Sequence, residues 1–215
     1  MKAVVIGATG ATGTELVQKL QEDPEIEKII IFVRKMPEKN LPKVTAYMVD
    51  FNHPESWKHF VFGDIAFSCL GTTLKDAGSK TEQYKVDFTY QFQFAQAARE
   101  NGIRQFVLVS AYGASGKSLI FYSRMKGELE EAVRKLNFPK LVIFRPGMLD
   151  RKKERRNNET RALKAIRFLN TLGLFKNQQP LPVDRLAQAM INANKKCPEG
   201  TTVISGPKIF ETAEK

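Results

Sequence analysis

Tyr122 and Lys126 have the spacing in this sequence that most directly suggests catalysis. Residues four apart on a helix share one face, so the ammonium group lies one turn from the phenol. A nearby positive charge favours the phenolate and lowers the phenol pKa, which lets tyrosine exchange a proton with an alcohol or a carbonyl. Ser110 ends a predicted strand upstream and can hydrogen-bond the reacting oxygen. Such Tyr–Lys pairs are also common on exposed helix faces, so the hypothesis depends on the surrounding fold.

A glycine-rich turn near the N-terminus suggests where a cofactor binds. Segment 7–13 reads Gly-Ala-Thr-Gly-Ala-Thr-Gly, directly after an apolar strand and before a helix. In such turns the first glycine permits a tight bend, the second admits a pyrophosphate, and the third lets the helix pack on the strand. The helix N-terminus then offers N–H groups and a positive dipole end to the phosphates. The cofactor-binding residues predicted here are Gly7, Thr9, Gly10, Ala11, Thr12 and Gly13.

The end of the second predicted strand indicates which dinucleotide is bound. Sites for NAD usually place Asp or Glu there, about 20 residues after the turn, to bind the ribose hydroxyls. This sequence has Arg34 and Lys35 instead. Arg34 can form a bidentate contact with a 2′-phosphate and Lys35 adds a point charge, so NADP(H) is favoured over NAD(H).

The elements that position these residues alternate between strands and helices, which predicts βαβ units and a parallel sheet. We expect a short helical turn at 55–60. We expect strands at 3–6, 28–33, 44–49, 64–70, 105–109, 140–144 and 202–205. We expect helices at 14–22, 80–101, 119–136, 160–172 and 183–194.

Length and composition favour one domain spanning residues 1–215, with the part from about 148–215 building the substrate side. No apolar run reaches the roughly 20 residues needed to cross a bilayer, and Cys69 and Cys197 have no metal-ligand spacing. We therefore expect a cytoplasmic protein without a membrane span.

The chain is strongly basic, with a formal net charge of +11, and part of this charge lies in segment 151–156. This segment is either a solvated loop or a clamp over an anionic ligand. Without a reader motif, this charge does not predict a nucleic-acid partner.

These features together resemble the short-chain dehydrogenase/reductase superfamily, and more closely its short, atypical members related to the Tat-interacting proteins. Besides the turn, the strand-end cations, Ser110 and the Tyr–Lys pair, the resemblance rests on segments 69–73 and 145–147, Cys-Leu-Gly-Thr-Thr and Arg-Pro-Gly. It covers nearly the whole chain and is weakest after Asp150. It implies an α/β, three-layer Rossmann fold, a doubly wound parallel sheet of order 3-2-1-4-5-6-7 with helices on both faces.

The resemblance also implies roles for individual residues. Tyr122 is the general acid/base, Lys126 holds the nicotinamide ribose and lowers the tyrosine pKa, and Ser110 orients the substrate oxygen. Asp50 and Phe51 border the adenine. The ribose path and the nicotinamide pocket are formed by Leu70, Gly71, Thr72, Pro146 and Gly147.

Departures from the family pattern leave the function open. Asp87 stands in the region where many active members use an asparagine to complete a proton relay. The leading hypothesis is an NADP(H)-dependent oxidoreductase acting on a small carbonyl or alcohol; the alternative is a non-catalytic NADP(H)-binding regulator that acts through a protein partner. Epimerase or dehydratase chemistry usually requires a larger C-terminal substrate domain. Segment 88–94 suits core packing or a dimer contact, so a monomer and a homodimer both remain open, and His53 and His59 lack companions for a metal site.

Overall fold

The computed structural model describes residues 1–38, 40–150 and 180–214. The basic segment 151–156 and the helix expected at 160–172 lie outside the described residues.

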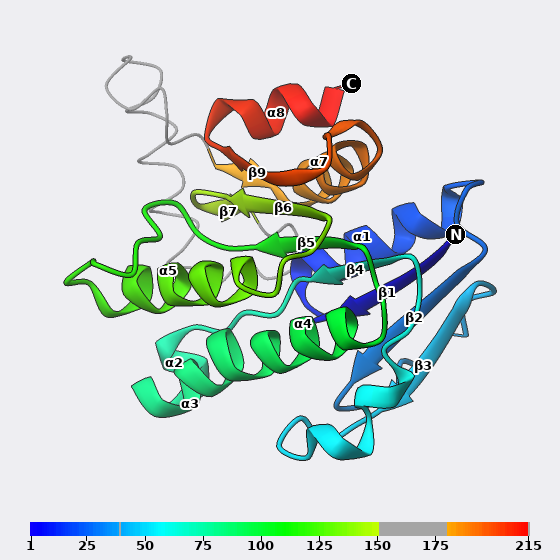
Figure 1. Cartoon of the computed structure of the whole chain (residues 1–215), viewed down its shortest axis with the longest axis horizontal. Coiled ribbons are helices and arrows are strands. Elements are labelled where there is room, and N and C mark those ends of the chain that lie inside the picture. Colours follow the sequence, from blue (N-terminus) through cyan, green and yellow to red (C-terminus); the bar gives the residue numbers. More distant parts are fainter. Residues whose placement is uncertain (39, 151–179, 215) are drawn as a thin grey trace.

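A parallel sheet of seven strands forms the centre of the described chain, in the order β3-β2-β1-β4-β5-β6-β9 (Figure 1). This confirms the predicted order, with β9 as the seventh strand. The strands are β1 Lys2–Ile6, β2 Lys28–Val33, β3 Val44–Met48, β4 Ile65–Ser68, β5 Gln105–Val109, β6 Lys140–Arg145 and β9 Gly200–Ser205. Two short strands, β7 (Leu149–Asp150) and β8 (Leu181–Pro182), pair separately.

Helices cover both faces of the sheet, giving the predicted three layers (Figure 1). One face carries α1 (Ala11–Glu22), α7 (Val183–Lys196) and α8 (Pro207–Glu214). The other carries α4 (Tyr90–Glu100) and α5 (Phe121–Arg134).

The inner strands are apolar except at their ends, because both their faces are buried. Along β1, Ala3 and Val5 join the core under α1 and α7, whereas Val4 and Ile6 join the core under α4 and α5. The alternation of a β-strand thus supplies two cores from one short segment.

The segment predicted as one helix at 80–101 is divided into three parts. Helix α3 (Lys80–Tyr84) leads into a π-helical turn (Lys85–Thr89), and α4 follows without a break. A π-helical turn inserts an extra residue per turn and often marks a functional site. Here it holds Asp87 with no exposed surface. Before α3, a short helix α2 (Leu74–Ala77) begins at Thr73, whose side chain caps it.

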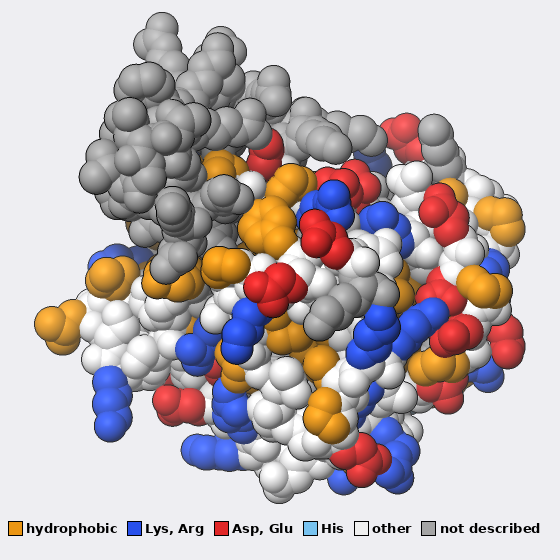
Figure 2. Space-filling view, turned by 90° about the horizontal axis from the view of Figure 1, so that it is seen from above, with side chains coloured by type: hydrophobic (Ala, Val, Ile, Leu, Met, Phe, Trp, Pro, Cys, Tyr) orange, Lys and Arg blue, Asp and Glu red, His pale blue; other side chains and the backbone are white. Residues whose placement is uncertain are grey.

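The surface over α7 and α8 mixes both charge signs. Figure 2 shows Lys and Arg side chains interspersed with Asp and Glu on this face. Lys195 pairs with Asp23 at 2.9 Å and with Glu25 at 3.4 Å. No helix in the described ranges is both long and apolar enough to span a membrane.

Candidate functional site

A cavity of about 420 Å³ lies at the carboxyl ends of β1, β4, β5 and β6. The strand order reverses between β1 and β4, and ligands of open α/β sheets bind in the crevice at such a reversal. Most of the predicted site residues meet in this lining. They are Gly10, Ala11, Thr12, Leu70, Gly71, Thr72, Ser110, Tyr122, Lys126, Pro146 and Gly147.

The turn between β1 and α1 can accept only glycine at two positions. Gly7 has φ 79°, and a Cβ there would lie 2.6 Å from the carbonyl carbon of Cys69. A Cβ on Gly13 would lie 2.1 Å from the Gly7 oxygen, so α1 packs directly on the turn. No side chain among the described residues caps α1 at Gly10. The first-turn N–H groups of the helix are therefore available to an anion, as at other phosphate sites.

Lys126 and Asp87 form a buried ion pair at the wall of the cavity. Lys126 Nζ lies 2.8 Å from Asp87 Oδ1, and their side chains are 2% and 0% exposed. The other carboxylate oxygen, Asp87 Oδ2, accepts a hydrogen bond from the Thr72 backbone N–H at 2.9 Å. The carboxylate balances the ammonium charge, so the positive potential at Tyr122 is weaker than the Tyr–Lys spacing alone suggests.

Buried amides hold the strand-end segment that follows β4, a feature that the sequence analysis missed. The Thr72 carbonyl accepts from Gln83 Nε2 at 3.3 Å. Gln91 Nε2 donates to the backbone carbonyl of Asp87 at 2.9 Å and its Oε1 accepts from Ser68 Oγ at 2.8 Å. Glutamines inside a helix give no sequence signal of such a role, because their burial depends on how the π-helical turn rotates the helix.

Ser110 does not present its hydroxyl as the sequence led us to expect. Its Oγ donates to Glu130 Oε1 at 2.6 Å, in a buried contact. Arg145 holds the same carboxylate from the other side, through Nε at 2.9 Å and Nη2 at 2.6 Å. The hydrogen bond to Glu130 raises the pKa of Arg145 above its ordinary value. Glu130 lines a separate hollow with Arg134. Ser110 still lines the cavity beside Tyr122, but its proton is used in the hydrogen bond to Glu130.

The adenosine end of the expected site lies beyond the cavity lining. Arg34 and Lys35 are exposed directly after β2, next to the turn at Gly7 because β1 and β2 pair in parallel. Asp50 is also exposed, and a hydrogen bond from the Asn52 backbone N–H lowers the pKa of its carboxyl group.

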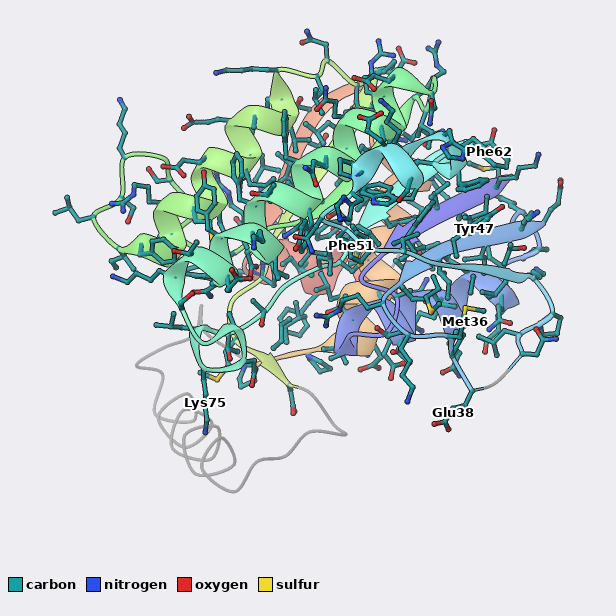
Figure 3. The ribbon with its side chains drawn as sticks, turned by 90° about the horizontal axis from the view of Figure 1, so that it is seen from below. Met36, Glu38, Tyr47, Phe51, Phe62 and Lys75 are labelled. Atoms are coloured by element: carbon teal, nitrogen blue, oxygen red, sulfur yellow. The ribbon has the colours of Figure 1, made fainter. Side chains whose placement is uncertain are left out.

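Phe51, which we expect together with Asp50 to border the adenine, lies mostly inside the fold. It is 5% exposed, and its ring centre lies 5.7 Å from that of Trp57 and 5.5 Å from that of Tyr90. Figure 3 shows Phe51 inside the ribbon, whereas Met36 and Glu38 lie on the peripheral loop after β2. The Phe51 side chain therefore offers a ligand little exposed area.

Metal and thiol chemistry find no support at this site. No group of three His, Cys, Asp or Glu side chains within the described residues could hold a metal ion. Burial raises the pKa of the Cys69 thiol to about 12, so it is protonated at neutral pH and is a poor nucleophile.

Sequence comparisons match this chain to a known family and to mitochondrial proteins. The model of the NAD(P)H-binding family matches residues 7–169. The protein fmp52, mitochondrial, of Emericella nidulans is 31% identical over 96% of this chain and 92% of its own length. The protein FMP52, mitochondrial, of Saccharomyces cerevisiae is 36% identical over 69% of this chain and 66% of its own length. The expectation of a cytoplasmic protein was wrong by this comparison, because these relatives are named as mitochondrial.

Solved structures with the same fold include nucleotide-sugar epimerases. UDP-glucose 4-epimerase of Thermotoga maritima has a TM-score of 0.73 and 14% identity, over 97% of this chain and 77% of its own. The enzyme WbmH of Bordetella bronchiseptica, solved with NAD+, has a TM-score of 0.69 and 14% identity, over 95% of this chain and 75% of its own. At this identity the likeness establishes the Rossmann-like fold alone.

Proposed function

This chain belongs to the NAD(P)H-binding family, and we propose that it is an NADP(H)-dependent oxidoreductase acting on a small carbonyl or alcohol. The observation that carries the proposal is one shared cavity. Tyr122 and Lys126 line it together with the first residues of α1, where a pyrophosphate would bind. A proton-transfer group and a dinucleotide site therefore face the same space.

The residues present fit a dinucleotide. Gly7 and Gly13 have no side chain, so α1 packs closely on the turn, where a Cβ at either position would clash with backbone atoms. Ala11 and Thr12 would bind the pyrophosphate, and Leu70, Gly71 and Thr72 would follow the ribose toward Pro146 and Gly147. When bound, the nicotinamide supplies or accepts the hydride.

The preference for NADP(H) rests on the cations after β2. Arg34 and Lys35 are both exposed and stand where an acidic residue would otherwise receive the ribose hydroxyls of NAD. A guanidinium pairs with the 2′-phosphate through two parallel hydrogen bonds, and a lysine adds attraction without direction.

Proton exchange is assigned to Tyr122. Tyr122 is 39% exposed and lines the cavity, so a substrate oxygen can reach its phenol. Asp87 fixes the Lys126 ammonium at the wall, where it can hold a ribose hydroxyl in one position. Lys126 is thus a positioning group for the cofactor as much as a charge acting on Tyr122. The names of the relatives further support a mitochondrial location for this reaction.

Replacing Tyr122 by Phe tests the proposal, because the change removes one hydroxyl and keeps the ring. We expect Tyr122→Phe to reduce NADPH-dependent reduction of a panel of aldehydes and ketones by about 100-fold or more, with NADPH affinity unchanged. The measurement is the absorbance of NADPH during turnover, with Tyr47→Phe as control. The Tyr47 ring stacks on Phe60 outside the cavity.

Equal turnover by Tyr122→Phe and the wild type would contradict the assignment of the proton. A wild type that binds NADPH yet reduces no carbonyl would favour the non-catalytic regulator instead. This second function is retained because Asp87 stands in the region where active members of the superfamily often carry an asparagine.

A further inference from the structure

A substrate oxygen beside Tyr122 needs a second hydrogen-bond donor, and the cavity hydroxyls are not equally able to provide it. Donors aimed at an oxygen that gains charge are a main source of catalysis in such sites. The Ser110 hydroxyl is committed to Glu130. The Thr73 hydroxyl donates to Asp76 at 2.7 Å, as part of the cap of α2. Thr12 and Thr72 also line the cavity, but they lie where the pyrophosphate and the ribose of the dinucleotide are proposed to bind.

We propose that Tyr112 is this second donor, contacting the substrate oxygen in the place expected for Ser110. The inference rests on the proposed function. Tyr112 lines the same cavity as Tyr122, and it is 57% exposed, so its phenol is accessible to a ligand. Neither phenol has a hydrogen-bond partner within the described part of the chain, whereas Ser110 and Thr73 have theirs.

The backbone at Tyr112 is fixed although the side chain is exposed. The Tyr112 N–H donates to the Pro146 carbonyl at 2.8 Å, which ties the segment after β5 to the segment after β6. Gly113 then has φ 73°, a left-handed conformation that turns the chain away from the sheet. Tyr112 lines the cavity, and a phenol extends farther from its backbone than a serine hydroxyl does.

The same wall indicates the class of substrate. Besides the two phenols, the lining includes Pro146 and Leu149. Among the described lining residues, Lys126 is the only cation and Asp76 the only anion. Because Asp87 already balances Lys126, this end of the cavity offers an anionic substrate no free positive charge. Aromatic and apolar surface with two hydroxyl donors suits an aldehyde or ketone carried on an aromatic or apolar body.

Binding of an inert carbonyl probe tests the inference without requiring turnover. We would titrate benzamide into the protein–NADPH complex by calorimetry, for the wild type, Tyr112→Phe, Tyr112→Leu and Ser110→Ala. We expect Tyr112→Phe to weaken benzamide binding by about three- to tenfold, the value of one hydrogen bond. Tyr112→Leu also removes the ring and should weaken it further, whereas Ser110→Ala should change it less than twofold.

The first step separates the failure of this inference from failure of the proposed function. If the wild type does not bind NADPH, the proposed function fails. If NADPH binds but benzamide does not, or binds equally to the wild type and Tyr112→Phe, the role of Tyr112 is overturned. Weaker binding in Ser110→Ala alone, with its melting temperature retained, would return the role to Ser110.

Discussion

At the scale of single residues, the least expected feature is a buried ion pair beside the cavity. Lys126 and Asp87 lie 2.8 Å apart with almost no exposed surface. Removing two charges from water is costly, and only their mutual attraction and further hydrogen bonds offset that cost. Asp87 also accepts from Thr72, so the pair joins α5, the π-helical turn and the segment after β4.

Breaking this pair should destabilise the fold strongly. We expect Lys126→Met to lower the free energy of unfolding by about 3–5 kcal/mol, because it leaves Asp87 buried without compensation. Adding Asp87→Asn should restore most of the loss, since asparagine can still accept from the Thr72 N–H. Urea unfolding measures both variants.

A surface pair supplies the control for this experiment. Lys85 and Glu82 lie 3.0 Å apart but are 41% and 52% exposed. Glu82→Gln should therefore change the free energy of unfolding by less than about 1 kcal/mol. If the losses from Lys126→Met and Asp87→Asn simply added in the double variant, the pair would not be coupled as described.

The sequence identified residue types better than side-chain directions. Residues of the glycine turn and the Tyr–Lys pair line one cavity, as predicted. Their positions could be predicted because the geometry of a turn or a helix depends on residues close together in sequence. Ser110 was predicted to face the substrate, but whether the side chain at a strand end faces the cavity depends on the register of β5 and on Glu130 from α5. Tyr112 carried no motif, so only the structure singles it out.

At the scale of elements, the helix predicted at 80–101 shows where periodicity fails. Apolar spacing continues through the segment, so it predicts one unbroken helix. The structure inserts a π-helical turn at Lys85–Thr89, and Asp87 becomes fully buried there. Lys126, which pairs with Asp87 in this turn, lies on α5 and is distant in sequence. The sequence around Asp87 therefore could not predict the π-helical turn.

A charge pair that titrates in acid, Asp23 with Lys195, joins the C-terminal ends of α1 and α7. Burial tends to raise the pKa of Asp23, but hydrogen bonds from Lys195 and the Glu25 N–H, with the charges of Lys195 and Lys43, outweigh it and lower the pKa. Hydrogen bonding to Asp23 correspondingly raises the pKa of Lys195. A carboxyl pKa lowered by folding stabilises the fold above its unfolded value of about 4. That stabilisation is lost as the pH falls through the lower, folded value.

Asp23→Asn should therefore matter most near neutral pH. We expect the variant to melt below the wild type at pH 7 and the difference to shrink as the pH falls below about 4. Melting curves from pH 7 to pH 2.5 measure this, with Glu27→Gln as control because the Glu27 side chain is 79% exposed. A difference in melting temperature that stays constant across this range would show that Asp23 does not act through its charge.

At the scale of the whole molecule, strand order was predictable and the substrate side was not. Alternating apolar strands and helices, with a glycine turn after the first strand, allow few topologies, and the sheet follows the expected order. The chain after Gly147 contains no readable motif, and residues 151–179 lie outside the described structure. The expected cytoplasmic location was also wrong. It rested on composition alone, whereas the relatives found by comparison are named as mitochondrial.

Binding of the two dinucleotides tests the central claim most directly. Fluorescence titrations would compare NADPH and NADH on the wild type, Arg34→Ala and Arg104→Ala, a control at an exposed site paired with Glu199. We predict that the wild type binds NADPH at least about tenfold more tightly than NADH, as charge-assisted hydrogen bonds to one phosphate require. Arg34→Ala should remove most of this preference and leave NADH binding unchanged, and Arg104→Ala should behave as the wild type. A wild type that binds neither dinucleotide, or prefers NADH, would contradict the account.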